Sequence, residues 1–295
     1  MILNVSGRTD IVAFYSEWFF KRIESGYVDV RNPFYPKLVS RIYFEDVDLI
    51  LFCTKNPTPL LDKITEINIP YLIFITLTGY KNDIEPNVPS KKELIQVIQK
   101  LSTKIGKEKI VIRYDPVFKS KKYPLEYHIK AFEKLCKLLN GYVTKIIISF
   151  LDDYKNVQKN KSIIQDIPFT RKDYETLGKN FSKIAKENKM TVQTCFEQIN
   201  LVEYGFIKDD CISKELAYKL TGKKFKKWQA RKGNACNCAE MVDIGEYNTC
   251  KHFCKYCYAN YDEKKVAQNF HQHNPTSSLL IGSLKSDDII KRRKS

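Results

Sequence analysis

Residues 71–76 read Tyr-Leu-Ile-Phe-Ile-Thr and residues 90–93 read Ser-Lys-Lys-Glu, and together they indicate how this chain folds. The first stretch is apolar along its length, which is typical of a strand buried on both faces of a parallel sheet. The second has the form of a capping box, in which Ser90 caps a helix and Glu93 reaches back to it. Apolar residues then recur at helical spacing as far as Gly106. The pattern predicts a strand–helix unit.

The same alternation repeats through the first two-thirds of the chain. Repeated strand–helix units favour an α/β fold with right-handed crossovers, and we expect a parallel (β/α) barrel or a partial TIM-like barrel. Helices are expected over residues 11–24, 90–106 and 127–139 and from Thr170 onward. The expected strands are Ile2–Ser6, Leu49–Cys53, Tyr71–Thr76, Ile110–Arg113, Lys145–Phe150 and Thr191–Cys195.

The composition is that of a globular protein, with 43% hydrophobic and 28% charged residues in a chain of 295. Wholesale disorder is therefore excluded. The chain has neither an apolar run near the ~20 residues that cross a bilayer nor a signal peptide, so we expect a cytoplasmic protein without a membrane partner. Residues 1–205 are predicted to form the barrel core, and residues 206–295 a basic, cysteine-rich iron–sulfur segment packed on it.

The net charge is +16. Residues 219–232 contribute to it as a basic stretch in which Phe225 and Trp228 are interleaved with lysines. Lysine and arginine with interleaved aromatic residues can bind nucleic acid through phosphate contacts and base stacking. A solvated helix face that buries Trp228 explains the same pattern. Glycine-rich loops of the Rossmann or P-loop kind are absent, so nucleotide binding in those modes has no support.

Charged residues follow several of the predicted strands. In parallel α/β folds the carboxyl ends of the strands meet at one face, where active sites lie. We therefore expect a substrate pocket in which cations bind an anionic group while carboxylates orient them or handle protons. The same residues could instead only tie loops together. The predicted catalytic residues are Arg8, Lys55, Arg113, Asp115 and Glu197.

Three cysteines near the C-terminus, Cys250, Cys254 and Cys257, have C-x3-C-x2-C spacing. Three thiolates at this spacing can bind one 4Fe–4S cluster and leave the fourth iron without a protein ligand. The alternative is a structural zinc site that also uses Cys236 and Cys238. These two could also hold a second metal, zinc or iron–sulfur, or one of them could close the fourth position of the cluster.

The C-x3-C-x2-C stretch, with the aromatic Tyr256 before its last cysteine, resembles the motif of radical S-adenosylmethionine (SAM) enzymes. The resemblance implies that SAM chelates the open iron and is cleaved reductively, with an electron donor such as flavodoxin or ferredoxin. Tyr256, Tyr258 and Asn260 are then the expected cofactor-binding residues. The substrate would be an unknown, anionic small molecule or nucleic acid. The rival prediction is a nucleic-acid-binding or repair protein with a structural metal.

A wider resemblance covers nearly the whole chain. It rests on segments such as Ser6-Gly-Arg-Thr-Asp10, Thr54-Lys-Asn-Pro57, Arg113-Tyr-Asp-Pro116 and Asp243-Ile-Gly-Glu-Tyr-Asn-Thr-Cys250. By these segments the chain resembles the bacterial domain-of-unknown-function family eighteen-forty-eight, whose cysteine cluster lies near the C-terminus. The Thr-Lys and Arg-x-Asp-Pro elements also resemble strand ends of enzymes related to spore photoproduct lyase. Radical SAM enzymes usually carry the motif before the barrel, whereas only 38 residues follow Cys257 here (295 − 257). Either the cluster loop caps a barrel formed before it, or the cluster is an appendage without SAM chemistry.

Overall fold

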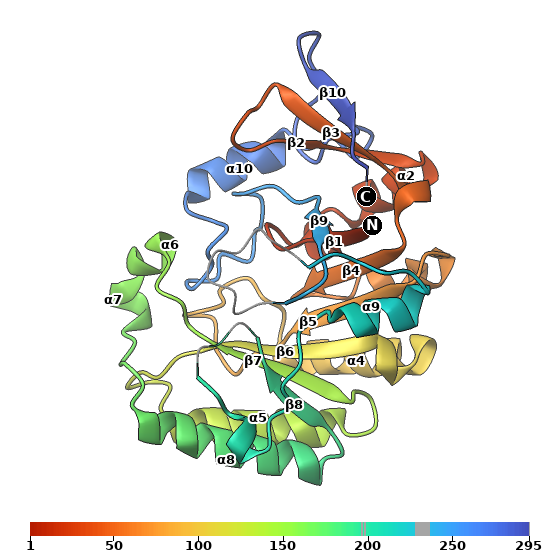
Figure 1. Ribbon diagram of the computed structural model, residues 1–295. Coiled ribbons are helices and arrows are strands. Elements are labelled where there is room, and N and C mark those ends of the chain that lie inside the picture. Colours follow the sequence, from red (N-terminus) through yellow and green to blue (C-terminus); the bar gives the residue numbers. More distant parts are fainter. Residues whose placement is uncertain (196, 198, 228–236, 295) are drawn as a thin grey trace.

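The computed structural model describes residues 1–195, 197, 199–227 and 237–294, which form two β-sheets with helices packed around them (Figure 1). The larger sheet has the strand order β8-β7-β6-β5-β4-β1-β9, and every neighbouring pair is parallel. The parallel α/β fold expected from the sequence is confirmed. The strands of this sheet are β1 (Ile2–Val5), β4 (Leu49–Thr54), β5 (Tyr71–Thr76), β6 (Ile110–Val117), β7 (Lys145–Phe150), β8 (Thr191–Thr194) and β9 (Met241–Asp243).

The helices include all four that the sequence predicts. The predicted capping box is present at Ser90 before α4, and the structure has a second one at Thr170 before α8. The helix expected over residues 11–24 is interrupted at Tyr15, because the side chain of Asp10 caps a first short helix and a second one begins at Ser16. The helices are α1 (Ile11–Phe14), α2 (Ser16–Glu24), α3 (Leu60–Lys63), α4 (Lys91–Ile105), α5 (Leu125–Leu139), α6 (Lys155–Gln158), α7 (Lys161–Ile164), α8 (Arg171–Glu187), α9 (Lys214–Thr221) and α10 (Glu263–His271), with 3₁₀ turns at Phe44–Asp46, Ile64–Glu66, Lys107–Lys109 and Val202–Tyr204.

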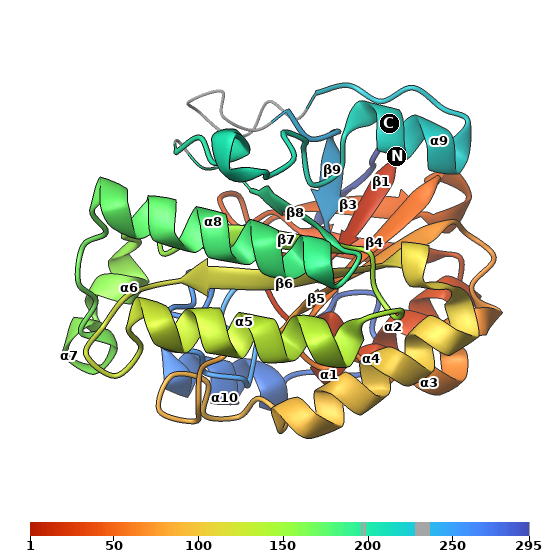
Figure 2. The same ribbon diagram turned by 90° about the horizontal axis from the view of Figure 1, so that it is seen from below.

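Both faces of the large sheet are buried, which explains why its strands are apolar throughout. One face packs against α2, α4, α5 and α8, and alternate strand residues such as Leu3, Phe52 and Ile112 point into this core. The opposite face carries residues such as Ile2 and Leu51, and α9 and the segments beside it cover them. Figure 2 shows α4 and α5 below the strands and α9 above them, at the upper right of the view.

The large sheet ends at β8 and β9, and no ladder joins these two strands within the described residues. Residues 207–212 lie between them. The amide of Ile207 donates to the carbonyl of Val192 in β8, and the amide of Ala239, just before β9, donates to the carbonyl of Ile212. The hydrogen-bonded strands therefore form an open sheet rather than a closed barrel, and an irregular segment bridges its two edges.

The C-terminal third contributes strands to both sheets, in addition to the cysteine motif. β9 extends the large sheet beyond β1, and β10 (Ile289–Arg292) pairs with β3 (Leu38–Tyr43) and, through it, with β2 (Tyr27–Arg31). This small sheet was not expected from the sequence. Arg292 and the N-terminal amine both contact Asp46, and Figure 1 shows the two chain ends close together. Among the described residues, no helix is both long and apolar enough to span a membrane.

Candidate metal and substrate site at the strand ends

Residues 248–262, which we call the cysteine loop, contain Cys250, Cys254 and Cys257. Asn248 closes this loop, because its side-chain oxygen accepts hydrogen bonds from the amides of Tyr261 (2.8 Å) and Asp262 (3.2 Å). Asn248 adopts a left-handed backbone conformation, with φ of 55°, and asparagine tolerates this region better than most residues. Phe253, directly before Cys254, has φ of 53°. The chain thus turns sharply between the first and second cysteines.

The cysteine loop lies on the loops that follow the strands of the large sheet. The ring nitrogen Nε2 of His252 forms a hydrogen bond of 2.9 Å with the carboxylate of Asp10, which follows β1. The amide of Lys255 donates to the carbonyl of Ile84, in the loop after β5, at 2.9 Å. The side chain of Asn160 donates to the carbonyl of Lys255 at 2.7 Å. The cysteine loop therefore lies at the carboxyl ends of the strands, where the predicted catalytic residues also lie.

The three thiols of the cysteine loop share one buried environment. Burial raises the pKa of Cys254 to about 12, and burial also raises the pKa values of Cys250 and Cys257. Cys250 and Cys254 each lie close enough to the other thiols of the loop for their charges to interact. Water does not stabilise the thiolate form of a buried cysteine, so the thiol keeps its proton. A metal bound by these sulfurs would stabilise the thiolate form instead.

The donor chemistry of the cysteine loop fits a thiophilic metal or an iron–sulfur cluster, because all three side chains are sulfur ligands. The side-chain oxygen of Asn260 is buried without a hydrogen-bond partner, although its amide nitrogen donates to the carbonyl of Cys250. This oxygen is a polar atom that a bound group could satisfy. In the described part of the chain, no three His, Cys, Asp or Glu side chains are already gathered at metal-binding distances.

A charged network lies beside the cysteine loop. Glu85 is 1% exposed and accepts hydrogen bonds from the ammonium groups of Lys55, at 2.8 Å, and Lys91. It also accepts hydrogen bonds from the hydroxyls of Thr78, at 2.8 Å, and Tyr256. Despite burial, the two ammonium groups lower the pKa of Glu85 to about 2. Two cations therefore surround one carboxylate, and the network carries a surplus positive charge near Cys254.

The predicted residues on β6 and after β8 form a second polar group. The guanidinium of Arg113 binds Asp115 through Nε at 2.9 Å and Nη2 at 2.5 Å, and Ser149 donates to the same carboxylate. Glu197 accepts a hydrogen bond from the amide of Phe150 at 2.8 Å. Burial raises the pKa of Glu197 to about 8. The charge of Asp115 also acts on Lys55, so the two polar groups are neighbours.

Arg8 lies at the β9 side of the same face and pairs with Asp243, at 3.1 Å from its Nε. Asp243 also accepts hydrogen bonds from the side chains of Asn4 and Ser6 and from the amide of Gly7. This carboxylate therefore joins the end of β9 to the loop after β1. All five predicted catalytic residues lie at the carboxyl ends of the large sheet, and the three cations among them are already paired with carboxylates.

Residues 2–259 match the family described as Domain of unknown function (DUF1848). The chain belongs to this family. The resemblance to this family that the sequence segments indicate is thereby confirmed, and the match includes both the large sheet and the three cysteines of the loop. No curated protein matches this DUF1848 chain. A solved structure from Bacteroides thetaiotaomicron, described as a candidate alpha-L-fucosidase, shares 12% identity over 76% of this chain and 81% of its own, with a TM-score of 0.26. That likeness is too low to inform fold or function.

The expected cofactor-binding residues of the DUF1848 chain already take part in holding the cysteine loop. The hydroxyl of Tyr256 donates to Glu85 and that of Tyr258 donates to the carbonyl of Gly7. Asn260 donates to the loop through its amide nitrogen and keeps its oxygen unpaired. Of the three side chains, Asn260 is therefore the one with a polar atom still to satisfy.

Several residues of this face were missed by the sequence analysis, namely Asp10, Glu85 and Asp243. Glu85 lies nine residues beyond the end of β5, so its position after a strand gave no signal. Asp10 is buried and shares its carboxylate between His252 and the amide of Lys55, at 2.9 and 2.7 Å. The sequence also left Cys195 and Cys211 unassigned, although both lie near Arg113.

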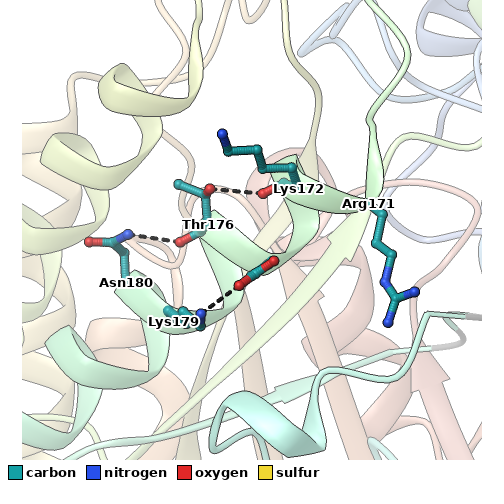
Figure 3. Close-up of a pocket in the computed structure, with 6 residues that line it drawn as sticks. Arg171, Lys172, Thr176, Lys179 and Asn180 are labelled. Atoms are coloured by element: carbon teal, nitrogen blue, oxygen red, sulfur yellow. Dashed lines mark hydrogen bonds and ion pairs between the residues drawn. The ribbon is translucent and has the colours of Figure 1, made fainter.

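Two of the hollows on the surface of the described residues differ in where they lie. One is on the exposed side of α8, where Thr176, Lys179 and Asn180 hydrogen bond to residues of the same helix (Figure 3). The other lies beside the charged network and is lined by the loop after β5, with Glu85 and Lys91 among its residues. Only the second hollow adjoins the strand-end site.

The basic stretch of residues 219–232 is described only as far as residue 227, so Trp228, Arg231 and Lys232 lie outside the described residues. Within it, Lys223 forms an ion pair of 2.5 Å with Asp48, next to the N-terminal amine. This lysine thus has a structural partner. Cys236, which the sequence suggested as a metal ligand with Cys238, also lies outside the described residues.

Proposed function

We propose that this protein is an iron–sulfur enzyme of the radical SAM type, in which Cys250, Cys254 and Cys257 hold a 4Fe–4S cluster. One observation carries the proposal: the loop with the three-cysteine motif lies on the carboxyl ends of a parallel sheet, beside two partly buried cations. In the same proposal the sheet is a partial TIM-like barrel whose mouth the loop caps. Bound there, the cluster and SAM would supply one-electron reduction and cleavage of a carbon–sulfur bond.

The residues of the chain itself would bind and orient anionic groups. Arg8 and Arg113 are each neutralised by one carboxylate, whereas Lys55 and Lys91 share the single carboxylate of Glu85. The surplus charge makes this network the best place for an incoming carboxylate or phosphate, because a buried cation is stabilised by a further anion. Asp115 and Glu197 would orient the cations or handle protons across the mouth.

The cysteine loop would keep water from the bound groups. Tyr256 packs against Tyr80, with ring centroids 5.9 Å apart, and both belong to an apolar cluster that includes Cys254 and Phe118. Apolar residues around a metal site limit the access of solvent, and they strengthen the electrostatic interactions between the charges within the site. The substrate is proposed to be an anionic small molecule or a nucleic acid, and the electron donor a flavodoxin or ferredoxin.

The test is anaerobic reconstitution with iron and sulfide, followed by reduction in the presence of SAM. We expect about four irons and four sulfides bound at this site per chain, as the cluster formula requires, and release of 5′-deoxyadenosine. Cys254→Ala should lose the cluster and reduce nucleoside release to background. Cys136→Ala, a change in a buried cysteine of α5, serves as the matched control and should keep both. Product release by the Cys254→Ala variant, or its absence from a fully loaded wild-type protein, would contradict the proposal.

A further inference from the structure

A second group of cysteines comes together on the face of the large sheet that α9 covers. Cys211 and Cys238 belong to one apolar cluster on this face, and Cys195 packs against the same cluster. Cys195 directly follows β8, Cys211 precedes α9, and Cys238 precedes β9. The three side chains therefore come from three separate segments, and we call them the dispersed thiol group.

Backbone hydrogen bonds fix the segments that carry these thiols. The amide of Cys195 donates to the carbonyl of Ile148 in β7 at 3.0 Å. The amide of Ala239 donates to the carbonyl of Ile212 at 2.9 Å, which joins the residues that follow Cys238 and Cys211. The path by which the chain bridges the two edges of the sheet therefore brings the three cysteines into one cluster.

The surroundings of the dispersed thiol group are apolar, with one cation. Cys211 and Cys238 are 8% and 5% exposed and pack in a cluster with Leu49 and Ile147. The Nη1 atom of Arg113 lies 3.8 Å from the sulfur of Cys211. This guanidinium binds Asp115 through Nε and Nη2 and also faces the sulfur of Cys211, where it would stabilise a thiolate.

We propose that Cys195, Cys211 and Cys238 form a second metal site, which takes a thiophilic ion such as zinc or an iron–sulfur cluster. Thiols lose their protons when they bind a metal, and two thiolates on one tetrahedral zinc lie about 3.8 Å apart, as Zn–S bonds of about 2.3 Å require. The described residues do not yet hold three sulfurs at such spacing, so metal binding would draw them together. This site is independent of the cluster proposed above.

The test uses the triple variant Cys250→Ala/Cys254→Ala/Cys257→Ala, which cannot bind a cluster on the cysteine loop. After anaerobic loading with zinc, or with iron and sulfide, we expect it to retain one metal centre per chain. Charge-transfer absorption after loading with Co²⁺ would show that thiolates bind the metal. If the centre is an iron–sulfur cluster, the sample loaded with iron and sulfide would retain sulfide as well as iron. Adding Cys211→Ala should remove the bound metal, while adding Cys136→Ala should not. Failure of the proposed enzyme activity would leave this result unchanged.

A second measurement needs no further substitution. In the metal-loaded triple variant, alkylation followed by mass spectrometry should find Cys195, Cys211 and Cys238 protected until a chelator is added. Cys136, buried in α5, should stay protected throughout. A triple variant that binds no metal, protection that does not respond to the chelator, or a disulfide between Cys195 and Cys211 in anaerobically purified protein would overturn the proposal.

Discussion

The two groups of cysteines in this protein differ in how the chain brings them together. Cys250, Cys254 and Cys257 lie within eight consecutive residues, whereas Cys195, Cys211 and Cys238 depend on the path of the chain between β8 and β9. Local spacing positions the first group, and tertiary structure positions the second. A sequence motif therefore identifies the first group. The second group can be recognised only in the three-dimensional structure, where the chain between β8 and β9 brings its cysteines together.

The two groups also differ in their surroundings. Polar loops and the Glu85 network surround the cysteine loop, whereas the dispersed thiol group packs in an apolar cluster with Arg113 as its cation. A metal near several paired charges and the strand ends can meet a substrate, while one beneath α9 is shielded. We therefore assign chemistry to the first group and expect the second to support structure or carry electrons.

The largest expected effect that separates the two groups is that of Glu85→Gln. The change keeps the shape of the side chain but leaves Lys55 and Lys91 without a carboxylate in a buried setting. Breaking a buried ion pair in this way costs about 3–5 kcal/mol. Urea unfolding should show this loss, and metal retention should fall on the cysteine loop but not on the dispersed thiol group.

The matched control for this change is Glu17→Gln, which removes an exposed ion pair with Lys21 in α2. Exposed pairs of this kind contribute about 0.3–0.5 kcal/mol, so its unfolding midpoint should stay close to that of the wild type. Equal effects of the two substitutions would show that Glu85 is not the anchor of the cysteine loop.

Much of the large sheet could be predicted, because its strands are apolar runs and two of its long helices, α4 and α8, begin with capping boxes. The small sheet could not, since β2 reads Tyr-Val-Asp-Val-Arg and β10 reads Ile-Ile-Lys-Arg, and neither shows an apolar run of strand length. Val28 and Ile42 pack in the core, and two ion pairs also join the strands of this sheet and the residues beside them: Asp29 with Arg41, and Arg31 with Asp288. Such long-range charge pairs leave no local pattern in the sequence.

The site was predictable to the extent that its residues directly follow strands or belong to one motif. Arg8 and Lys55 satisfy that condition, and Arg113 ends the predicted strand although it lies within the longer β6. Glu85 and Asp243 do not, because a long loop carries the first and a three-residue strand positions the second. The dispersed thiols escaped for the same reason: their spacing in the sequence says nothing about contact in the fold.

Acid should weaken the support of the cysteine loop through His128. This residue is fully buried in α5, where its ring nitrogens lie 3.0 Å from the hydroxyl of Tyr114 and 2.9 Å from the carbonyl of Phe118. Its ring packs against Tyr80, which contacts Tyr256. Burial lowers the pKa of His128 from 6.5 to about 4. Stability should therefore decrease as the pH falls from 6.5 to 4, because only the unfolded chain takes up the proton there.

The size of this pH effect is about 3 kcal/mol, since one pKa unit corresponds to 1.36 kcal/mol. The aromatic hydroxyls that face His128 are those of Tyr80, Tyr114 and Tyr127, whose pKa values burial raises, so none changes its charge in this range. Urea midpoints at pH 7.5 and pH 4.5 should differ less in His128→Gln than in the wild type. An unchanged difference would assign the acid sensitivity to other groups.

A change in α9 should affect the dispersed thiol group alone. Ala217 is fully buried in the cluster that contains Cys211 and Cys238, so Ala217→Leu adds volume where none is free. Overpacking of this kind costs about 1–3 kcal/mol. We expect weaker metal retention by the triple cysteine variant when it also carries Ala217→Leu, and unchanged cluster content on the cysteine loop in the otherwise native chain. Loss of metal from both groups would mean that they form one structural unit.

The smallest expected effect is that of Tyr258→Phe, which tests whether this residue holds the loop or the cofactor. Its hydroxyl donates to the carbonyl of Gly7, while its ring is 45% exposed. Removing one partly exposed hydrogen bond costs about 1 kcal/mol, so the urea midpoint should fall slightly. Release of 5′-deoxyadenosine should stay within a few-fold of the wild type, because the hydroxyl is already used by the loop. A tenfold or larger loss of release at an unchanged midpoint would instead place Tyr258 in contact with SAM.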